Sequence, residues 1–175
     1  MTHSSCALYR LPVSLAFIAC LMPQAGAQTG AQDGTHTVVL SSVKDNTIYE
    51  AQGFSNALSP QMYAGPGGND LRRALVQFDV EGAVPVGSTV VHAALTLHVL
   101  SEQASGFDPH FALPLTASWG EGTSSGPAKP GAPATRGDVT WFHRFHPGEP
   151  WTSPGGDFTA GAVLLATGAV GDALT

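Results

Sequence analysis

Residues 139 to 158, VTWFHRFHPGEPWTSPGGDF, gather the side chains of this chain that are best suited to bind a ligand. The stretch holds Trp141, Trp151 and Arg144 in a protein whose aromatic content is 8% and charged content 11%. A flat indole ring can cover the apolar face of a sugar, and an arginine can pair with an acidic group. We therefore take Trp151, Trp141 and Arg144 as candidate ligand contacts.

Each tryptophan also has a structural interpretation. Trp151 lies between Pro150 and Thr152 in a Gly/Pro-rich loop, where an exposed platform and a core position are equally reasonable. Trp141 follows a Gly-Asp turn, and its type and place favour a core aromatic. Trp119, at the end of a predicted strand, favours packing as well.

Carboxylates in or beside Gly-rich loops suggest a second kind of site. Asp138, Asp157 and Glu121 could offer hard oxygen ligands to a structural calcium ion, and solvated or turn-capping carboxylates are the alternative. His143 and His146 are three positions apart. On a strand that spacing places their rings on opposite faces, which disfavours a shared zinc ion.

Catalysis is not expected. The sequence has no Gly-x-Ser-x-Gly elbow and no HExxH motif. Glu121 and Glu149 could serve as a glycosidase pair only if the fold brought them together, and nothing in the sequence does so. Arg72 and Arg73 are neighbours on a predicted strand, so one should point inward and pair with a carboxylate such as Asp79 or Asp45.

The first 27 residues have the three parts of a secretory signal peptide. Arg10 precedes the apolar run LPVSLAFIACLM, and the small residues Ala25-Gly26-Ala27 suit cleavage. The run is shorter than the ~20 residues that a membrane span needs, although a retained anchor is the alternative. We expect a secreted protein (extracellular, on the cell surface or periplasmic) with no membrane span after cleavage, and with a flexible lead-in over 28–37 before one domain over 38–175.

Cleavage would change the composition in two ways. Both cysteines lie in the signal peptide, so the mature chain would have no thiol or disulfide. Loss of Arg10 would leave 6 Lys and Arg against 13 Asp and Glu, a net charge of −7. Nucleic-acid binding, which needs a basic surface, is excluded on this basis.

Short stretches rich in β-branched and apolar residues recur along the domain and are separated by Gly, Pro, Asn and Ser. They are THTVVLSS, DNTIYEA, RRALVQFDV, STVVHAALTLHVL, HFALPLTASW and DVTWFHRF. Residues 90–99 alternate, with Val91, Leu95 and Val99 on one parity and His92 on the other. The pattern predicts an all-β protein, an antiparallel β-sandwich of the jelly-roll type.

Two further segments carry expectations. Residues 120–137, GEGTSSGPAKPGAPATRG, predict either a mobile linker or a functional loop. Residues 160–175, AGAVLLATGAVGDALT, begin as a strand with no closing strand after it. The sandwich is therefore expected to lack its C-terminal strands.

Several motifs resemble those of bacterial DNRLRE-domain proteins, which are related to a family of carbohydrate-binding modules. They are SSVKDNTIYE, RRALVQFDV and the block from LTASWGEGTSSG to GDVTWFHRFHPGEPWTSPGGDF. The namesake hexapeptide corresponds to residues 45–50, DNTIYE, in which Thr47 and Tyr49 replace the two arginines. The resemblance runs from about residue 38 to the end, and its specific part is the later block.

This resemblance implies a β-sandwich, export and, in some members, binding of polysaccharide, often beside a lyase or other enzyme. It implies no shared catalytic residues. We expect a secreted, non-catalytic module for carbohydrate binding or surface attachment, with a polysaccharide and an adjoining catalytic or surface domain as partners. A structural spacer of a surface protein is the alternative, and a metal-dependent hydrolase is a distant third.

Overall fold

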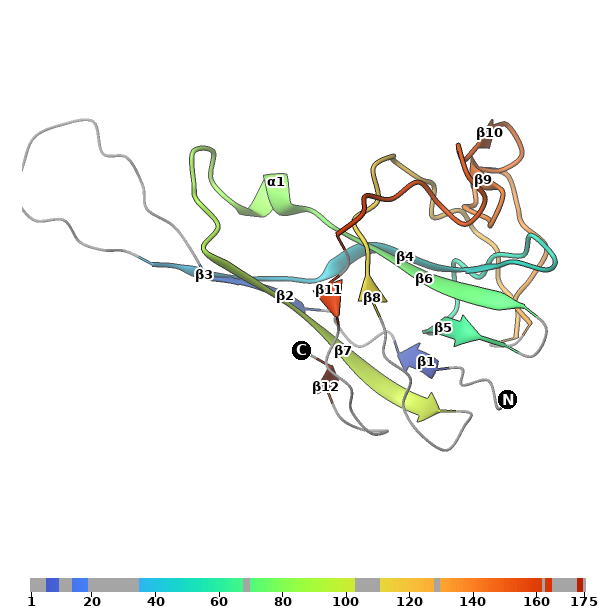
Figure 1. Ribbon diagram of the computed structural model, residues 1–175, viewed down its shortest axis with the longest axis horizontal. Helices are drawn as coiled ribbons and strands as arrows, with labels where there is room; N and C mark the ends of the chain where they lie inside the picture. The colour runs from blue at the N-terminus through green and yellow to red at the C-terminus, as the bar shows by residue number, and fades with distance from the viewer. Residues whose placement is uncertain are drawn as a thin grey trace, which may run out of the picture.

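The computed structural model is an antiparallel β protein with almost no helix, as the sequence predicts (Figure 1). It describes residues 6–9, 14–18, 35–67, 70–102, 111–127, 130–161, 163–164 and 173–174. The strands are β1 (Cys6–Tyr9), β2 (Ser14–Ile18), β3 (Thr37–Leu40), β4 (Ser42–Tyr49), β5 (Gln61–Pro66), β6 (Leu71–Phe78), β7 (His92–Glu102), β8 (Phe111–Ala112), β9 (His143–Phe145), β10 (Glu149–Pro150), β11 (Val163–Leu164) and β12 (Ala173–Leu174).

The main sheet has eight strands. Its order is β3-β2-β7-β1-β5-β6-β4, and β12 pairs with β7 outside this path. All of its pairs are antiparallel. In Figure 1, β3 and β2 lie away from β5 and β6, and β7 runs from beside β2 to beside β1. Strand β5 was not among the predicted strands, because Gly65 and Pro66 interrupt its apolar pattern.

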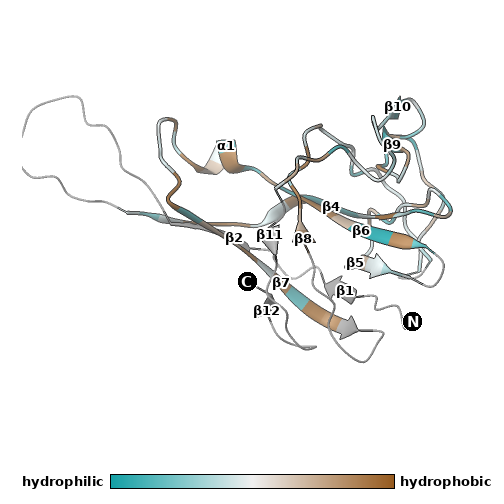
Figure 2. Ribbon diagram, viewed as in Figure 1, coloured by the Kyte–Doolittle hydropathy of each residue, from teal (hydrophilic) through white to brown (hydrophobic). Residues whose placement is uncertain are grey.

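Strand β6 has apolar contacts on both of its faces, and it carries both hydrophobic and hydrophilic residues, which Figure 2 shows as bands along the strand. On one face, Ala74, Val76 and Phe78 pack against a cluster formed by Met62, Leu97 and Val99. On the other face, Leu75 belongs to a second cluster with Ile48, Trp119, Val139, Trp141 and Trp151. Because successive side chains of a strand point to opposite faces, this one strand connects the two clusters.

The segment after β8 folds against β4 and β6 largely without regular strands. Residues 138–146, predicted as one strand, form a strand only at β9. The hydroxyl of Thr140 accepts hydrogen bonds from the backbone N–H groups of Phe142 and His143, at 3.1 and 2.9 Å, and this local turn competes with extended backbone. The prediction of a strand from 138 was therefore wrong at its beginning.

One short helix interrupts the otherwise all-β pattern that the sequence predicts. Helix α1 (Val80–Ala83) is one turn, and the side chain of Asp79 caps it by accepting a hydrogen bond from the Gly82 N–H at 2.9 Å. None of the described residues belongs to a helix that could cross a membrane.

The termini bear on the predicted domain boundaries. Residues 6–9 and 14–18, inside the predicted signal peptide, form β1 and β2 of the main sheet in the full chain. The predicted lead-in lies mostly outside the described residues, and its last residue, Thr37, begins β3. Most of the segment from 162 to the end also lies outside them, so its predicted incompleteness stays a prediction.

Candidate functional site

The two tryptophans proposed as ligand platforms are buried. Trp141 and Trp151 each expose 5% of their surface in the second apolar cluster, and the indole N–H of Trp151 donates to the backbone oxygen of Thr140 at 2.9 Å. A ring so enclosed cannot offer a face to a sugar. The prediction that Trp151 and Trp141 contact a ligand is corrected accordingly, and both are core residues, as Trp119 is.

Phe158, unlike these tryptophans, exposes part of its aromatic ring at the surface. The Arg73 guanidinium lies over the Phe158 ring at 5.2 Å and over the Trp141 ring at 4.6 Å, and it donates to the Gly155 backbone oxygen. Phe158 is 42% exposed. Phe158 is therefore partly open to solvent while Arg73 lies against its ring.

Phe158 borders a shallow hollow of about 530 Å³. Its walls also include Thr116, Thr152, Ser153 and Asp157. The N–H of Thr116 donates to the Asp157 backbone oxygen at 2.9 Å, and Leu115 and Phe158 form an antiparallel bridge. These contacts hold two segments, 115–116 and 157–158, side by side under the hollow.

Asp157 contributes a carboxylate to this hollow. Its Oδ2 accepts the Thr152 N–H and its Oδ1 accepts the Ser153 N–H, both at 3.0 Å. The hydrogen bond from Thr152 is the main reason why the pKa of Asp157 lies below its ordinary value, and Ser153 and the charge of Arg144 act in the same direction. The group is therefore ionised at neutral pH.

Arg144, the third predicted ligand contact, lies at the surface beside the hollow. Its Nη2 is 2.7 Å from Oε2 of Glu149, and its Nη1 approaches the hydroxyl of Ser118 at 3.5 Å. Strands β9 and β10 set this pair, because Glu149 lies opposite Phe145 in their register. The charge of Arg144 is accordingly matched by a neighbouring carboxylate.

The carboxylates proposed for calcium serve the backbone instead. Asp138 is fully buried, and it accepts hydrogen bonds from the N–H groups of Thr123, Ser124 and Thr135 at 2.7, 3.3 and 2.6 Å. Oε1 of Glu121 accepts the Asp45 N–H at 3.2 Å.

Asp157 belongs to the hollow described above. Within the described part of the chain, no three His, Cys, Asp or Glu side chains are grouped so that they could hold a metal ion. The structure does not bring Asp138, Asp157 and Glu121 together as a calcium site.

The two histidines are closer than strand alternation predicted. The rings of His143 and His146 meet edge to face with centroids 5.1 Å apart. Strand β9 ends at Phe145, so the turn after it returns the His146 ring toward His143. Their predicted separation on opposite faces was wrong.

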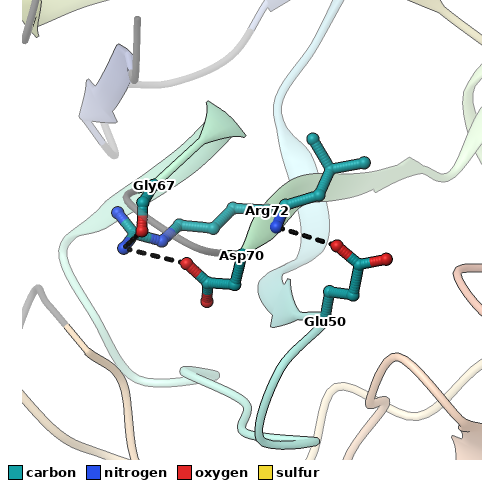
Figure 3. Close-up of polar contacts among 5 residues, drawn as sticks. Glu50, Gly67, Asp70 and Arg72 are labelled. Carbon is teal, nitrogen blue, oxygen red and sulfur yellow. Dashed lines mark hydrogen bonds and ion pairs between the residues drawn. The ribbon is translucent and has the colours of Figure 1, made fainter. Parts of the chain in front are cut away.

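Arg72 and Arg73 do point to opposite faces of β6, as predicted, but both are covered. Arg72 lies over the Tyr49 ring. It also donates to the Gly67 backbone oxygen at 3.0 Å and pairs with Asp70 at 3.4 Å (Figure 3). Its ion-pair partner is therefore Asp70, whereas Asp79 caps α1.

Phe158 and Thr116 were missed by the sequence analysis. The available signal was the sequence GGDF, which places an aromatic residue directly after a turn carboxylate. Nothing in the sequence shows that residues 115–116 would lie beside this turn.

The fold and the hollow thus define an antiparallel β protein with a shallow, carboxylate-bearing surface site. Comparisons of the chain with models of known protein families, with curated proteins and with solved structures give no match.

Proposed function

We propose that this chain is a secreted, non-catalytic module that binds polysaccharide through the hollow beside Phe158. The observation that carries the proposal is the partly exposed aromatic side chain of Phe158, which lines the hollow together with Asp157, Thr116, Thr152 and Ser153. A sugar ring presents an apolar C–H face and hydroxyl edges, which fit an aromatic face and polar neighbours of this kind. The resemblance of the sequence motifs to DNRLRE-domain proteins, with the β-sandwich and export that it implies, supports the same function.

The expected affinity is weak. One face of a phenylalanine ring covers about half of the ~150–250 Å² that an aromatic side chain can bury. At ~25 cal/mol/Å², this contributes about 2 kcal/mol before binding costs. Such a site works best in a protein that holds several of them or an adjoining domain, so surface attachment or service to a neighbouring catalytic domain belongs to the proposal.

The carboxylates near the hollow support a non-catalytic role. Glycosidases need one carboxyl group with a raised pKa as a general acid. Asp157 has a lowered pKa, and Glu149 is held in an ion pair with Arg144. Asp157 is therefore better suited to holding a ligand than to donating a proton, and Glu149 is already engaged by Arg144.

The test is a glycan array followed by affinity measurement on the polysaccharides that retain the protein. We expect Phe158→Ala to weaken binding by roughly 30-fold, which corresponds to the ~2 kcal/mol above. Phe142→Ala is the matched control, because Phe142 is 45% exposed and does not line the hollow. It should bind like the wild type, and circular dichroism should show both variants folded.

Two results would contradict the proposal. A wild-type protein that no glycan retains would favour the structural spacer. Equal binding by the wild type and by folded Phe158→Ala would place the ligand elsewhere on the molecule.

A further inference from the structure

The charges around the hollow are unequal. Asp157 lies in its wall as a partly exposed carboxylate. Among the described residues, Arg73 and Arg144 are the cations that contact residues of the hollow or influence them. Arg144 is neutralised by Glu149 at 2.7 Å, and Arg73 lies beneath Phe158, where it donates to the Gly155 backbone oxygen. Among the residues that line the hollow, Asp157 is the charged one, so a ligand seated there meets a negative charge at contact distance.

The Asp157 carboxylate keeps room for a further donor. Each of its oxygens accepts one backbone N–H, from Thr152 or Ser153. The Thr152 side chain adds a third hydrogen bond. Because a carboxylate has about four acceptor positions, one remains for a further donor. An ammonium group has three N–H donors and forms short, charge-assisted hydrogen bonds with such an acceptor.

Phe158 and Asp157 are suited to contact different parts of the same sugar. A positive group against the exposed part of the ring would be opposed by the Arg73 guanidinium, 5.2 Å from the ring centre. The ring therefore favours the uncharged C–H face of a sugar, and the adjacent Asp157 favours the sugar's positive substituent. A sugar ring with an amino group on its edge satisfies both residues at once.

We infer that the hollow prefers a polysaccharide of amino sugars with free ammonium groups and disfavours acidic polysaccharides such as polyuronates. The inference rests on the proposed function and names its ligand class. An acidic sugar would bring its carboxylate against Asp157, and no unpaired cation among the described lining residues compensates for that contact.

The test compares two oligosaccharides that share one backbone. Deacetylated chitin oligomers carry ammonium groups, and fully acetylated oligomers of the same length carry none. We expect isothermal titration calorimetry to show at least roughly tenfold tighter binding of the deacetylated oligomers, the size of one hydrogen bond to a charged group. The preference should shrink as salt is raised, because the Asp157 carboxylate is partly exposed to solvent.

Two variants locate the effect. Asp157→Asn should remove the preference while it keeps binding of the acetylated oligomer, because the amide oxygen can still accept one of the two backbone hydrogen bonds. Glu81→Gln is the matched control, since Glu81 is an exposed carboxylate on α1, away from the residues that line the hollow. It removes the same charge and should keep the preference.

The outcomes separate this inference from the function on which it rests. Equal affinity for the two oligomers, or tighter binding of a polyuronate, would overturn the amino-sugar preference and leave glycan binding in place. Absence of binding to every glycan would overturn both. If Asp157→Asn were unfolded in a thermal melt, the salt dependence and the oligomer comparison with the wild-type protein would still decide the question.

Discussion

Buried polar side chains in this protein are stabilised by neighbours of very different kinds. Arg73 meets two aromatic rings and one backbone oxygen, and burial lowers its pKa. Arg72 meets the Tyr49 ring, a backbone oxygen and a carboxylate at 3.4 Å. Since an unpaired buried charge is costly, these contacts explain how one strand carries adjacent covered arginines.

Tyr49 gives a prediction at alkaline pH. Burial raises its pKa from an ordinary 10.0 to about 12, and the nearby Asn56 and Arg72 offset the rise only in part. Because the folded-state pKa is raised, the stabilisation is complete below pH 10.0 and is lost as pH rises to about 12. At ~1.4 kcal/mol per pKa unit, the free energy of unfolding should fall by up to about 2–3 kcal/mol over this range.

The measurement is urea denaturation at several alkaline pH values for the wild type and Tyr49→Phe. The variant cannot ionise at this position, so the wild type should lose stability relative to the variant as pH rises from 10.0 to about 12. Tyr63, whose pKa burial also raises, is present in both proteins and cancels. Parallel curves would contradict a buried Tyr49 hydroxyl.

The exposure of the site residues could not be predicted from the sequence, although aromatic and carboxylate side chains in this region were expected. Trp151 stands between Pro150 and Thr152 in a Gly/Pro-rich loop, which suits an exposed ring, yet its indole N–H reaches Thr140 in the core. Asp157 was predicted only as a possible calcium ligand, and Phe158 beside it was not predicted to contact a ligand. Exposure depends on contacts between distant segments, such as Leu115 with Phe158, and local sequence patterns do not contain them.

At the scale of elements, the described part of the 120–137 loop is held by residues far from it in sequence. Asn46 donates to the Glu121 backbone oxygen at 2.8 Å, and Asn56 accepts the Gly126 N–H at 3.1 Å. The hydroxyl of Ser124 accepts the Ala57 N–H, also at 3.1 Å. The mobile-linker interpretation does not fit these residues, because they are hydrogen-bonded to partners about seventy positions away. The low-complexity sequence of the loop does not indicate these partners.

Two glycines of this loop allow a matched test. Gly122 and Gly137 both have positive φ, +76° and +89°. An added Cβ at Gly137 would meet no atom within 4 Å, whereas at Gly122 it would overlap the carboxylate of the fully buried Asp138. Gly137→Ala should therefore cost only the ~1–2 kcal/mol of a left-handed backbone.

Gly122→Ala should cost about 1–3 kcal/mol more, because overpacking is added to the same backbone strain. Denaturant unfolding of the two variants measures the difference. Equal losses of stability would mean that Asp138 does not contact this turn, and the account of the loop given above would then fail.

At the scale of the whole molecule, sequence periodicity predicts the class but not the sheet order. Alternation along residues 90–99 predicted β7, and Leu97 and Val99 are buried as that parity requires, whereas Val91 precedes the strand and is exposed. The pairings of β7 with β1 and β2 could not be predicted, because the sequence identified residues 1–27 as a removable signal peptide. Two strands near the centre of the sheet thus come from the segment that is expected to leave.

The position of β1 and β2 in the sheet predicts that their removal lowers the stability of the protein. Strand β1 lies between β5 and β7, and β2 lies between β3 and β7, so cleavage after Ala27 would leave three strand edges without these partners. Each lost hydrogen bond costs ~0.5–1.5 kcal/mol, so the free energy of unfolding of residues 28–175 should be at least about 3 kcal/mol lower than that of the full chain. Its free edges should also associate with other chains.

Chemical denaturation and sedimentation of both forms measure these effects. Ala7→Pro and Ala16→Pro in the full chain should reproduce part of the loss, because proline removes a backbone donor from a strand that is paired on both sides, as β1 and β2 are. A processed chain that stays monomeric and is as stable as the full chain would show that β1 and β2 contribute no stability. In that case β5 and β7 would have to be stable as free edges, and the twist and packing of the cluster formed by Met62, Leu97 and Val99 would hold the sheet together alone.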